Sequence, residues 1–401
     1  MRLIFLSNVF PNPLAPGKGT FNNSLVSTLA LRDTVRVISP VSWTDQLRWK
    51  GKLPRDTTEL GTNLTANFPT YYFTPRLFRS WYGDFMNWSI GPTVARAIAE
   101  IQPQAFLSYW AHPDGDVAVR HARRIGVPAL TMVGGSDVLL LARSGLRRRR
   151  ILQVLQRSDR ILAVSDDIAN RLERDGISHE KIRVIRRGVE QRLFFPDSQA
   201  EARTRLGLPA ARKIVIAVGR LVGVKGFDRL ILALKQLADR GEDLLGFILG
   251  TGELQGSLQK QIETLGLQEK VFLPGSQTQE RLADWYRAAD LTLLTSWSEG
   301  VPNVLLESIA CGTPFVGTNV GGVVEIADPQ WDRLVPAGDV TALAGAIGEQ
   351  LHRPRLVNQP RRYQPISWEA SADLIRSEIG DCLGLSCEAS AARCELLEVV
   401  S

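Results

Sequence analysis

The sequence is poor in cysteine and lacks the cysteine patterns of metal sites and disulfide scaffolds. Its 401 residues contain four cysteines, and three of them lie near the C-terminus. Their spacing matches no common metal-ligand motif. We therefore expect free thiols in a reducing compartment. The four residues are Cys311, Cys382, Cys387 and Cys394.

Long apolar runs are absent as well. No uninterrupted run reaches about 18 residues, so no transmembrane helix is expected. The opening segment MRLIFLSNVFPNP is soon broken by Asn and Pro and has no small-residue cleavage pattern, unlike a signal peptide. No solenoid repeat and no long low-complexity segment stand out. These absences predict a cytoplasmic protein.

The overall composition is that of a globular protein with a mild positive charge. The net charge of +6 gives no indication of nucleic-acid binding. It is compatible with anionic ligands such as diphosphates, or with an anionic membrane surface. Apolar residues make up 44% and charged residues 22%, which allows sizeable cores, and the length favours two domains.

Short apolar strands alternate with helix-like stretches along the whole chain. The strand-like runs are RLIFLS, VRVIS, AFLSYW, PALTMV, RILAVS and KIRVI in the first half, and KIVIAVG, LLGFILG, KVFLPG, LTLLTS and PFVGT in the second. Near-continuous apolar strands between helices indicate parallel sheets covered on both faces. The sequence therefore predicts an α/β fold with two doubly wound, Rossmann-like domains facing across a cleft.

The boundary between the two domains is expected close to Phe195. A polar stretch with Pro196 and Pro209 begins there and precedes a fresh strand. The first domain is then 1–194 and the second 195–366. Residues 367–384 are interpreted as a terminal helix that returns to the first domain, and 385–401 as a loosely held tail.

The segment SWSEGVPNVLLESIACGTP carries the most specific pattern of the second half. A helix is expected to begin near Pro302, because proline suits the first helical position, and to end at Gly312. Its N-terminus then lies at the carboxyl edge of the sheet. Free N–H groups and the positive end of the helix dipole suit a phosphate there.

Two glutamates accompany this helix start. Glu299 precedes the helix, where it can contact a sugar. Glu307 lies four residues after Asn303 on the same helix face, where a carboxylate can accept hydrogen bonds from two ribose hydroxyls. The alternative is a pair of solvated surface glutamates, which does not explain the Gly300, Pro302 and Asn303 setting between them.

This segment resembles the signature of glycosyltransferase family four, the group 1 glycosyltransferases of GT-B fold, in which two glutamates eight positions apart enclose Gly-x-Pro-Asn. The resemblance spans almost the whole chain. It implies a retaining, hexosyltransferase-type enzyme with a UDP- or GDP-sugar on the second domain and the acceptor on the first. The implied donor-binding residues are Gly19, Arg220, Lys225, Glu299, Gly300, Val301, Pro302, Asn303, Val304 and Glu307.

Arg220 and Lys225 follow the strand KIVIAVG and resemble the family's Gly-Arg-Leu…Lys-Gly motif. Two cations at this edge can neutralise a diphosphate leaving group. In the family this pair replaces a metal ion. The resemblance therefore implies catalysis by Arg220, Lys225 and Glu299 with no metal and no cofactor. The Asp114-Gly115-Asp116 triplet is interpreted as a turn and helix N-cap rather than as the manganese signature of a different glycosyltransferase fold.

The first half resembles the family with several departures. The sequence of the glycine-rich loop, FPNPLAPGKGTFNN, closely resembles that of polysaccharide-building, teichuronic-acid-type members. Tyr109 stands where the family often has a histidine, Gly134 replaces the histidine of a His-Gly-Ser-Asp motif, and Arg187 ends an Arg pair that replaces Pro-Asn. The implied acceptor-side or supporting residues are Gly17, His112, Gly134, Gly135, Ser136 and Asp137. His112 either compensates for the missing imidazole or, as lone histidines usually do, serves the structure.

Basic and aromatic residues concentrate in RLFRSWYGDFMNW and beside the run 147–150, which is four arginines. This mixture can seat a protein at an anionic membrane interface, for example beside a lipid-linked acceptor. Alternatively, the arginines form a solvated helix face and the aromatics pack in the core or between domains. Both interpretations stay open on the sequence alone.

Together these patterns predict sugar transfer from a nucleotide diphosphate donor to a glycan or lipid-linked acceptor, in cell-surface polysaccharide or lipopolysaccharide biosynthesis. The protein is expected in the cytoplasm or at the inner face of the membrane, without nucleic-acid partners. One alternative is a nucleotide-sugar epimerase of the same architecture, which the glutamate motif and the Arg220/Lys225 pair argue against. The other is a non-catalytic sugar-binding subunit, which Gly134 favours.

Overall fold

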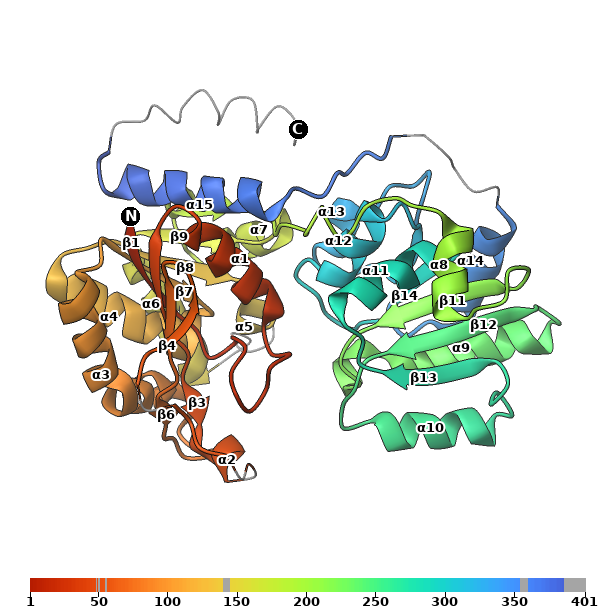
Figure 1. Cartoon of the computed structure of the whole chain (residues 1–401), viewed down its shortest axis with the longest axis horizontal. Helices are drawn as coiled ribbons and strands as arrows, with labels where there is room; N and C mark the ends of the chain where they lie inside the picture. Colours follow the sequence, from red (N-terminus) through yellow and green to blue (C-terminus); the bar gives the residue numbers. More distant parts are fainter. Residues whose placement is uncertain (48, 50, 55, 140–144, 354–359, 386–401) are drawn as a thin grey trace. The chain divides into compact units, whose positions relative to one another are not determined.

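The computed structural model describes residues 1–401 apart from 48, 50, 55, 140–144, 354–359 and 386–401. The chain forms two compact units, each built on a parallel sheet (Figure 1). The first is Met1–Gly188 with the segment from Trp368, and the second is Val189–Ser367. The sequence places the first boundary between 194 and 195, six residues after the observed one. It places the second between 366 and 367, one residue before the observed one. The expected tail lies outside the described residues from 386 onwards.

The first unit contains an eight-stranded sheet in the order β10-β9-β8-β7-β1-β2-β5-β4. Only β4 is antiparallel to its neighbour. The strands are β1 (Arg2–Leu6), β2 (Thr34–Ile38), β4 (Thr58–Gly61), β5 (Leu64–Asn67), β7 (Ala105–Tyr109), β8 (Ala129–Val133), β9 (Arg160–Ala163) and β10 (Ile182–Val184), and a separate ladder pairs β3 (Val41–Ser42) with β6 (Thr70–Tyr71). The strand order switches at β1, which has β2 on one side and β7 on the other.

Helices cover both faces of this sheet. Leu3 and Phe5 of β1 pack with α1 (Thr20–Ala30) and α15 (Trp368–Cys382). Ile4 and Leu6 face the opposite way, toward α3 (Tyr82–Ile101) and α4 (Asp116–Ile125), as the two-residue period of a strand requires. Figure 1 shows α15, the returning terminal helix, beside α1. The remaining helical segments are α2 (Trp43–Gln46), η1 (Arg79–Trp81), η2 (Ala111–Gly115), α5 (Ser136–Leu139), α6 (Gly145–Arg157), α7 (Asp166–Arg174) and η3 (His179–Lys181).

The second unit contains a six-stranded, all-parallel sheet in the order β13-β12-β11-β14-β15-β16. In order of appearance this is 3-2-1-4-5-6, the doubly wound arrangement of dinucleotide-binding domains. The strands are β11 (Lys213–Val218), β12 (Leu244–Leu249), β13 (Val271–Gly275), β14 (Leu291–Leu294), β15 (Phe315–Thr318) and β16 (Arg333–Val335). The predicted doubly wound α/β fold is confirmed in both units.

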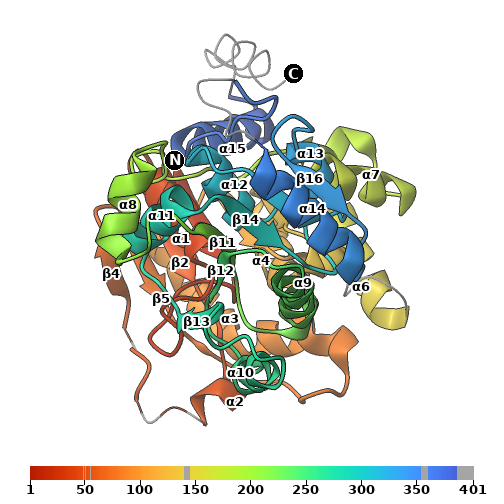
Figure 2. The ribbon, with the colours of Figure 1, turned by 90° about the vertical axis from the view of Figure 1, so that its right-hand side faces the viewer.

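Two groups of helices flank the second sheet. The buried residues of α9 (Phe227–Asp239), α10 (Gln255–Thr264) and α14 (Val340–His352) share one core with the strands. On the other face, Trp285 of α11 (Gln279–Ala288) packs on Phe247 of β12, and α11 contacts α8 (Gln199–Leu206) and α12 (Asn303–Ala310). Figure 2 shows α8 and α11 on one side of β11 and β12, with α9 on the other. The short segments are η4 (Gly223–Lys225) and α13 (Val323–Ile326).

Two expectations about absences concern the described part of the chain. Within it, no helix is both long and apolar enough to cross a bilayer. Cys311 is buried, Cys382 is half-buried, and both are free thiols. Cys387 and Cys394 lie outside the described residues.

Candidate functional site

The candidate site of the second unit lies where the order of its strands switches. β11 pairs with β12 on one side and β14 on the other, so the loops after β11 and β14 leave from neighbouring carboxyl ends. Open α/β sheets bind their ligands in this crevice. The loop after β11 carries Arg220 and Lys225, and the loop after β14 carries Glu299. Two motifs far apart in sequence therefore meet at one edge of one sheet.

An ion pair joins the two loops. Lys225 Nζ donates to Glu299 Oε1 at 2.6 Å, and Ser296 Oγ donates to the same oxygen at 2.6 Å. The side chains of Lys225 and Glu299 are 21% and 12% exposed, so both are largely shielded from water. Because an ammonium group has three donors, Lys225 keeps capacity for an anionic ligand beside Glu299.

Backbone contacts fix the geometry of this pair. Thr295 Oγ1 donates to the Lys225 carbonyl at 2.8 Å. At Gly226, with φ +64°, a Cβ would lie 2.3 Å from the Thr295 carbonyl oxygen. At Gly321, with φ +48°, a Cβ would lie 2.0 Å from the Glu299 carbonyl oxygen. Only glycine permits both approaches, so these two positions hold the Glu299 loop in place.

The helix that follows is α12. It begins at Asn303, with Pro302 as an extended N-cap residue, so the expectation of proline inside the first turn is wrong by one position. The helix ends at Ala310, and Gly312 takes φ +75°, the left-handed conformation of a helix end. The start of α12 lies directly after the Glu299 loop, which brings a helix N-terminus to the carboxyl edge of the sheet.

Glu307 occupies the second turn of α12. Its Oε2 accepts a hydrogen bond from the Tyr286 hydroxyl at 2.9 Å. The residue is half-buried, and its carboxyl group is shielded from water. Burial raises the pKa of Glu307 to about 7, and the hydrogen bond from Tyr286 opposes that rise. The alternative of a freely solvated surface glutamate does not describe this group.

The other predicted donor-binding residues of this unit lie around the same loop. The Arg220 side chain is exposed. Gly300, Val301 and Pro302 are buried, and the Gly300 carbonyl accepts a hydrogen bond from Gly322 at 2.8 Å. Asn303 and Val304 in the first turn of α12 are half-buried.

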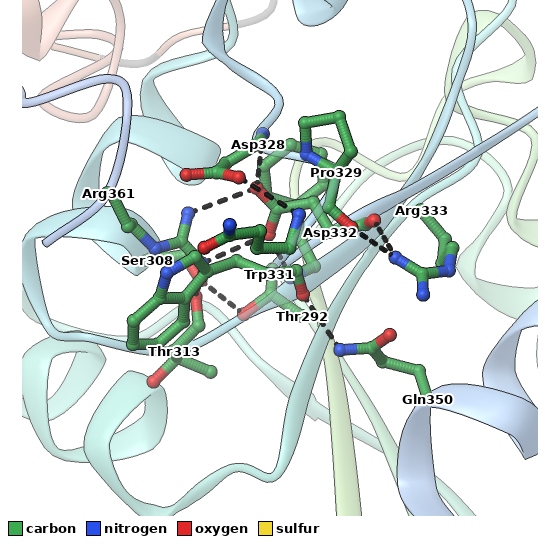
Figure 3. Close-up of polar contacts among 12 residues, drawn as sticks. Thr292, Ser308, Thr313, Asp328, Pro329, Trp331, Asp332, Arg333, Gln350 and Arg361 are labelled. Carbon is green, nitrogen blue, oxygen red and sulfur yellow. Dashed lines mark hydrogen bonds and ion pairs between the residues drawn. The ribbon is translucent and has the colours of Figure 1, made fainter. Parts of the chain in front are cut away.

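A buried polar network surrounds Arg361 and Asp332 (Figure 3). Arg361 and Asp332 form an ion pair at 3.0 Å, with side chains only 5% and 0% exposed. Burial raises the pKa of Asp332 to about 6, although Arg361 lowers it. Arg361 also donates to the Thr313 carbonyl at 3.4 Å, and Thr313 Oγ1 donates to the Tyr286 carbonyl at 2.7 Å. Tyr286, the partner of Glu307, is thereby tied to the buried pair.

Strand order switches in the first unit between β1 and β7, next to the glycine-rich loop. At Gly19, with φ +66°, a Cβ would lie 2.3 Å from the Val9 carbonyl oxygen, so glycine is required for α1 to begin here. Gly17 is exposed, and open space surrounds the position of its Cβ.

Three departures from the family pattern meet at this edge. A Cβ on Gly134 would lie 1.9 Å from the Tyr109 hydroxyl oxygen, and Arg187 Nη2 donates to that oxygen at 2.5 Å. The Arg187 guanidinium also lies 4.2 Å from the centre of the Phe21 ring. Burial raises the pKa of the Tyr109 phenol, and Arg187 lowers it. The Tyr109 hydroxyl therefore fills the room that a side chain at position 134 would need.

The turn from Gly134 to Asp137 is held from its other side. Asp137 Oδ1 accepts the N–H groups of Gly134 at 3.3 Å and Gly135 at 3.0 Å. Burial raises the pKa of Asp137 to about 6, and these backbone hydrogen bonds lower it. Ser136 begins α5. The predicted acceptor-side residues of this turn thus form one fixed backbone element.

His112 and Asp114 lie inside the first unit. His112 is buried, and its Nε2 accepts the Gly83 N–H at 3.2 Å, while burial lowers its pKa to about 4. Asp114 is buried and accepts the Asn8 N–H at 2.6 Å, and burial raises its pKa to about 7. Gly115 of the triplet is the N-cap residue of α4, as the sequence predicts, although no side chain forms a capping hydrogen bond there. Among the described residues, no group of three or more His, Cys, Asp or Glu is placed to hold a metal ion.

Solved structures show which fold this architecture belongs to. Sucrose-phosphate synthase from Thermosynechococcus elongatus has a TM-score of 0.77 and 20% identity, over 96% of this chain and 99% of that chain. HepE of Anabaena, solved with UDP, has a TM-score of 0.68 and 18% identity over 100% of both chains. The fold is that of GT-B glycosyltransferases, as expected from the sequence.

Sequence relatives refine this class. The D-inositol 3-phosphate glycosyltransferase of Nocardiopsis dassonvillei is 34% identical over 289 residues, which cover 66% of this chain and 67% of that protein. TuaC of Bacillus subtilis, a glycosyltransferase assigned to teichuronic acid biosynthesis, is 24% identical over 89% of this chain and 92% of its own. In several other D-inositol 3-phosphate glycosyltransferases the chain spans only about half of the relative, 47% to 55%.

Two family models match the chain, one in each half. Residues 198–365 match Glycosyl transferases group 1, and residues 32–192 match Glycosyltransferase Family 4. The chain belongs to this family, the group 1 glycosyltransferases of glycosyltransferase family four. The resemblance found in the sequence motifs is confirmed.

Proposed function

We propose that the protein transfers a hexose-type sugar from a nucleotide diphosphate donor to a glycan or lipid-linked acceptor, with retention of anomeric configuration. The Lys225–Glu299 ion pair at the strand-order switch of the second sheet carries the proposal. It unites the two motifs beside the start of α12, where a phosphate is favoured by free N–H groups and the helix dipole.

Each residue of this site has a distinct proposed role. Arg220 and Lys225 neutralise the diphosphate, whose negative charge grows as the glycosidic bond breaks. Glu307 accepts hydrogen bonds from the ribose hydroxyls, and Glu299 contacts the transferred sugar. The loop from Gly300 to Val304 lines the phosphates with its backbone. No metal ion or other cofactor takes part in this scheme, since the two cations do its electrostatic work.

The donor is proposed to be a UDP- or GDP-sugar. Solved structures of HepE contain UDP and, separately, UDP-glucose, which supports the uridine donor for a chain with the same fold. The Glu307 carboxyl group, held by Tyr286 at 2.9 Å, is suited to a ribose because it can accept two hydroxyl hydrogen bonds when ionised.

Retention is proposed to follow from attack on the same face of the sugar. The bond from the anomeric carbon to the diphosphate oxygen breaks, and its electron pair stays on the diphosphate. The acceptor oxygen forms the new bond to that carbon, and its proton passes to the departing diphosphate oxygen. The first unit is proposed to bind the acceptor through Gly17 and the turn 134–137, while Gly19 contributes to donor binding. His112 is buried and accepts a hydrogen bond from the Gly83 N–H, and its proposed role is to stabilise the structure around this turn.

The acceptor is proposed to be a glycan or a lipid-linked glycan of cell-surface polysaccharide or lipopolysaccharide biosynthesis. The similarity to TuaC over 89% of the chain supports this, and it favours a protein in the cytoplasm or at the inner face of the membrane. The D-inositol 3-phosphate glycosyltransferases favour a second candidate, a small phosphorylated polyol.

Transfer assays with radiolabelled UDP- and GDP-sugars test the proposal against its alternatives. We expect product in the presence of EDTA, and losses of at least about a hundredfold in Arg220→Ala and Lys225→Ala. A strict manganese requirement would overturn the metal-free scheme. Formation of a sugar epimer without acceptor would show an epimerase, and donor binding with no turnover on lipid extracts or inositol phosphate would show a non-catalytic subunit.

A further inference from the structure

Large apolar side chains lie exposed in one stretch of the first unit. We call them, with the arginines between them, the aromatic patch. Its apolar members come from the loop before η1, from the end of η1 and from the second turn of α3. They are Tyr72 (52% exposed), Leu77 (62%), Phe78 (64%), Trp81 (53%) and Trp88 (74%). The sequence left open whether the aromatics of this segment pack in the core, and the structure divides them. Phe85 packs against the core and Tyr82 contacts Phe73. Phe78, Trp81 and Trp88 are exposed.

The backbone holds these side chains outward. Arg76 and Phe78 adopt φ of +67° and +50°, a region that costs energy for residues other than glycine. Thr74 Oγ1 donates to the Leu77 carbonyl at 3.0 Å and stabilises the tip of the loop. Trp81 ends η1 directly before α3, and the Trp88 ring in the second turn of α3 lies 6.4 Å from the Tyr72 ring in an edge-to-face contact. The patch is therefore a fixed surface.

The charge around the patch is mainly positive, and Asp84 in the first turn of α3 is paired with Arg120 at 2.7 Å. Arg76 and Arg79 are exposed, and residues 71–83 contain no acidic residue. The start of α6 continues this surface, because the Arg147 guanidinium lies 6.0 Å from the Tyr82 ring centre. Burial, and then the nearby Arg79, lower the pKa of Arg147. Leu146, 65% exposed, precedes Arg147, and residues 138–158 contain no acidic residue either.

We infer that the aromatic patch docks the first unit on an anionic lipid bilayer. Indole and phenyl rings settle at the headgroup level, and arginines between them are attracted to anionic lipids. A second copy of the chain is a poorer occupant, since a self-complementary contact would bring arginines against arginines. The inference goes beyond sugar transfer, because bilayer binding requires neither donor nor acceptor.

Co-sedimentation of the full chain with unilamellar vesicles tests the inference. We expect binding to vesicles of phosphatidylglycerol and phosphatidylcholine at low salt, and little binding to phosphatidylcholine alone. Arg76→Ser/Arg79→Ser removes two charges and should weaken binding about 30-fold. The matched control Arg240→Ser/Arg281→Ser removes two exposed charges of the second unit and should leave binding within about twofold of the wild type.

The apolar part is tested separately. Trp81→Ser/Trp88→Ser should weaken binding at least about tenfold, while Leu31→Ser, at an apolar residue that is 73% exposed outside the patch, should not. Absence of sedimentation of the wild type with anionic vesicles would overturn the inference, as would equal losses in the controls. Analytical ultracentrifugation without lipid tests whether a second copy of the chain occupies the patch instead. A dimer that dissociates in the Trp variant would assign the patch to that second copy.

Discussion

Glu307 is a carboxyl group that changes charge near neutral pH in the ligand-free protein. Its pKa is raised to about 7 because burial disfavours the charged form. The carboxylate can accept hydrogen bonds from two ribose hydroxyls with both of its oxygens, whereas protonation turns one oxygen into a donor, so ligand binding and ionisation are coupled. A carboxyl group that is solvated at the surface would instead remain ionised at all pH values near neutral.

Nucleotide affinity should therefore rise with pH. Between pH 6 and pH 8 the ionised fraction of Glu307 increases roughly tenfold, and calorimetric affinity for UDP or GDP should follow. Glu307→Gln should bind more weakly and lose this part of the profile, while titration of the nucleotide itself affects both proteins equally. Tyr286→Phe removes the hydrogen bond that lowers the pKa, so its profile should move to higher pH. An identical profile in wild type and Glu307→Gln would refute the role.

Gly134 gives a second test at the level of residues. An alanine methyl group would lie 1.9 Å from the Tyr109 hydroxyl oxygen, and overpacking of this kind costs about 1–3 kcal/mol. Gly134→Ala should lower stability in thermal denaturation, and less so in a Tyr109→Ala background. Gly345→Ala in α14 is the matched control, since nothing lies within 4 Å of its Cβ, and it should stabilise slightly. Additive effects of the two substitutions at 109 and 134 would contradict this packing.

At the level of elements, most strands could be predicted, including the edge strands β10 and β13 from KIRVI and KVFLPG, but the edge strands β4 and β16 could not. β1 and β11 are buried runs, and their continuous apolar sequence was sufficient. β4 is mostly exposed and β16 has three residues, so neither leaves an apolar run to recognise. The start of α12 was missed by one residue because Pro302 is suited to positions on both sides of a helix start.

The Arg361–Asp332 ion pair could not be predicted from the sequence either, because its partners lie 29 residues apart and neither belongs to a motif. Breaking a buried ion pair leaves an uncompensated charge and costs about 3–5 kcal/mol. Arg361→Ala should therefore lower the midpoint of thermal unfolding of the second unit by roughly 6–20 °C. The exposed control Arg240→Ser should change it little. A midpoint unchanged by Arg361→Ala would show that the network in Figure 3 does not stabilise this unit.

At the scale of the whole molecule, the two-domain organisation could be predicted because apolar strands recur in both halves. The position of the boundary could not. Val189 donates to the Ile366 carbonyl at 2.9 Å, so the two chain segments that connect the units pair inside the second unit. A backbone hydrogen bond between residues this far apart leaves no local signal, whereas Pro196 and the polar stretch after it do. Likewise, the sequence shows three separate departures from the family pattern, at Tyr109, Gly134 and Arg187. Their contact with one another appears only in the folded structure.

The central claim is that the second unit binds a nucleotide diphosphate sugar through Lys225, and thermal unfolding with a panel of UDP-, GDP-, ADP- and dTDP-sugars tests it most directly. A donor present at 100 times its dissociation constant adds about 2.7 kcal/mol, a shift of roughly 5–10 °C. The account predicts such a shift for at least one donor in the wild type and in the exposed control Lys260→Ala, and its loss in Lys225→Ala. No shift with any donor, or an equal shift in Lys225→Ala, would contradict it.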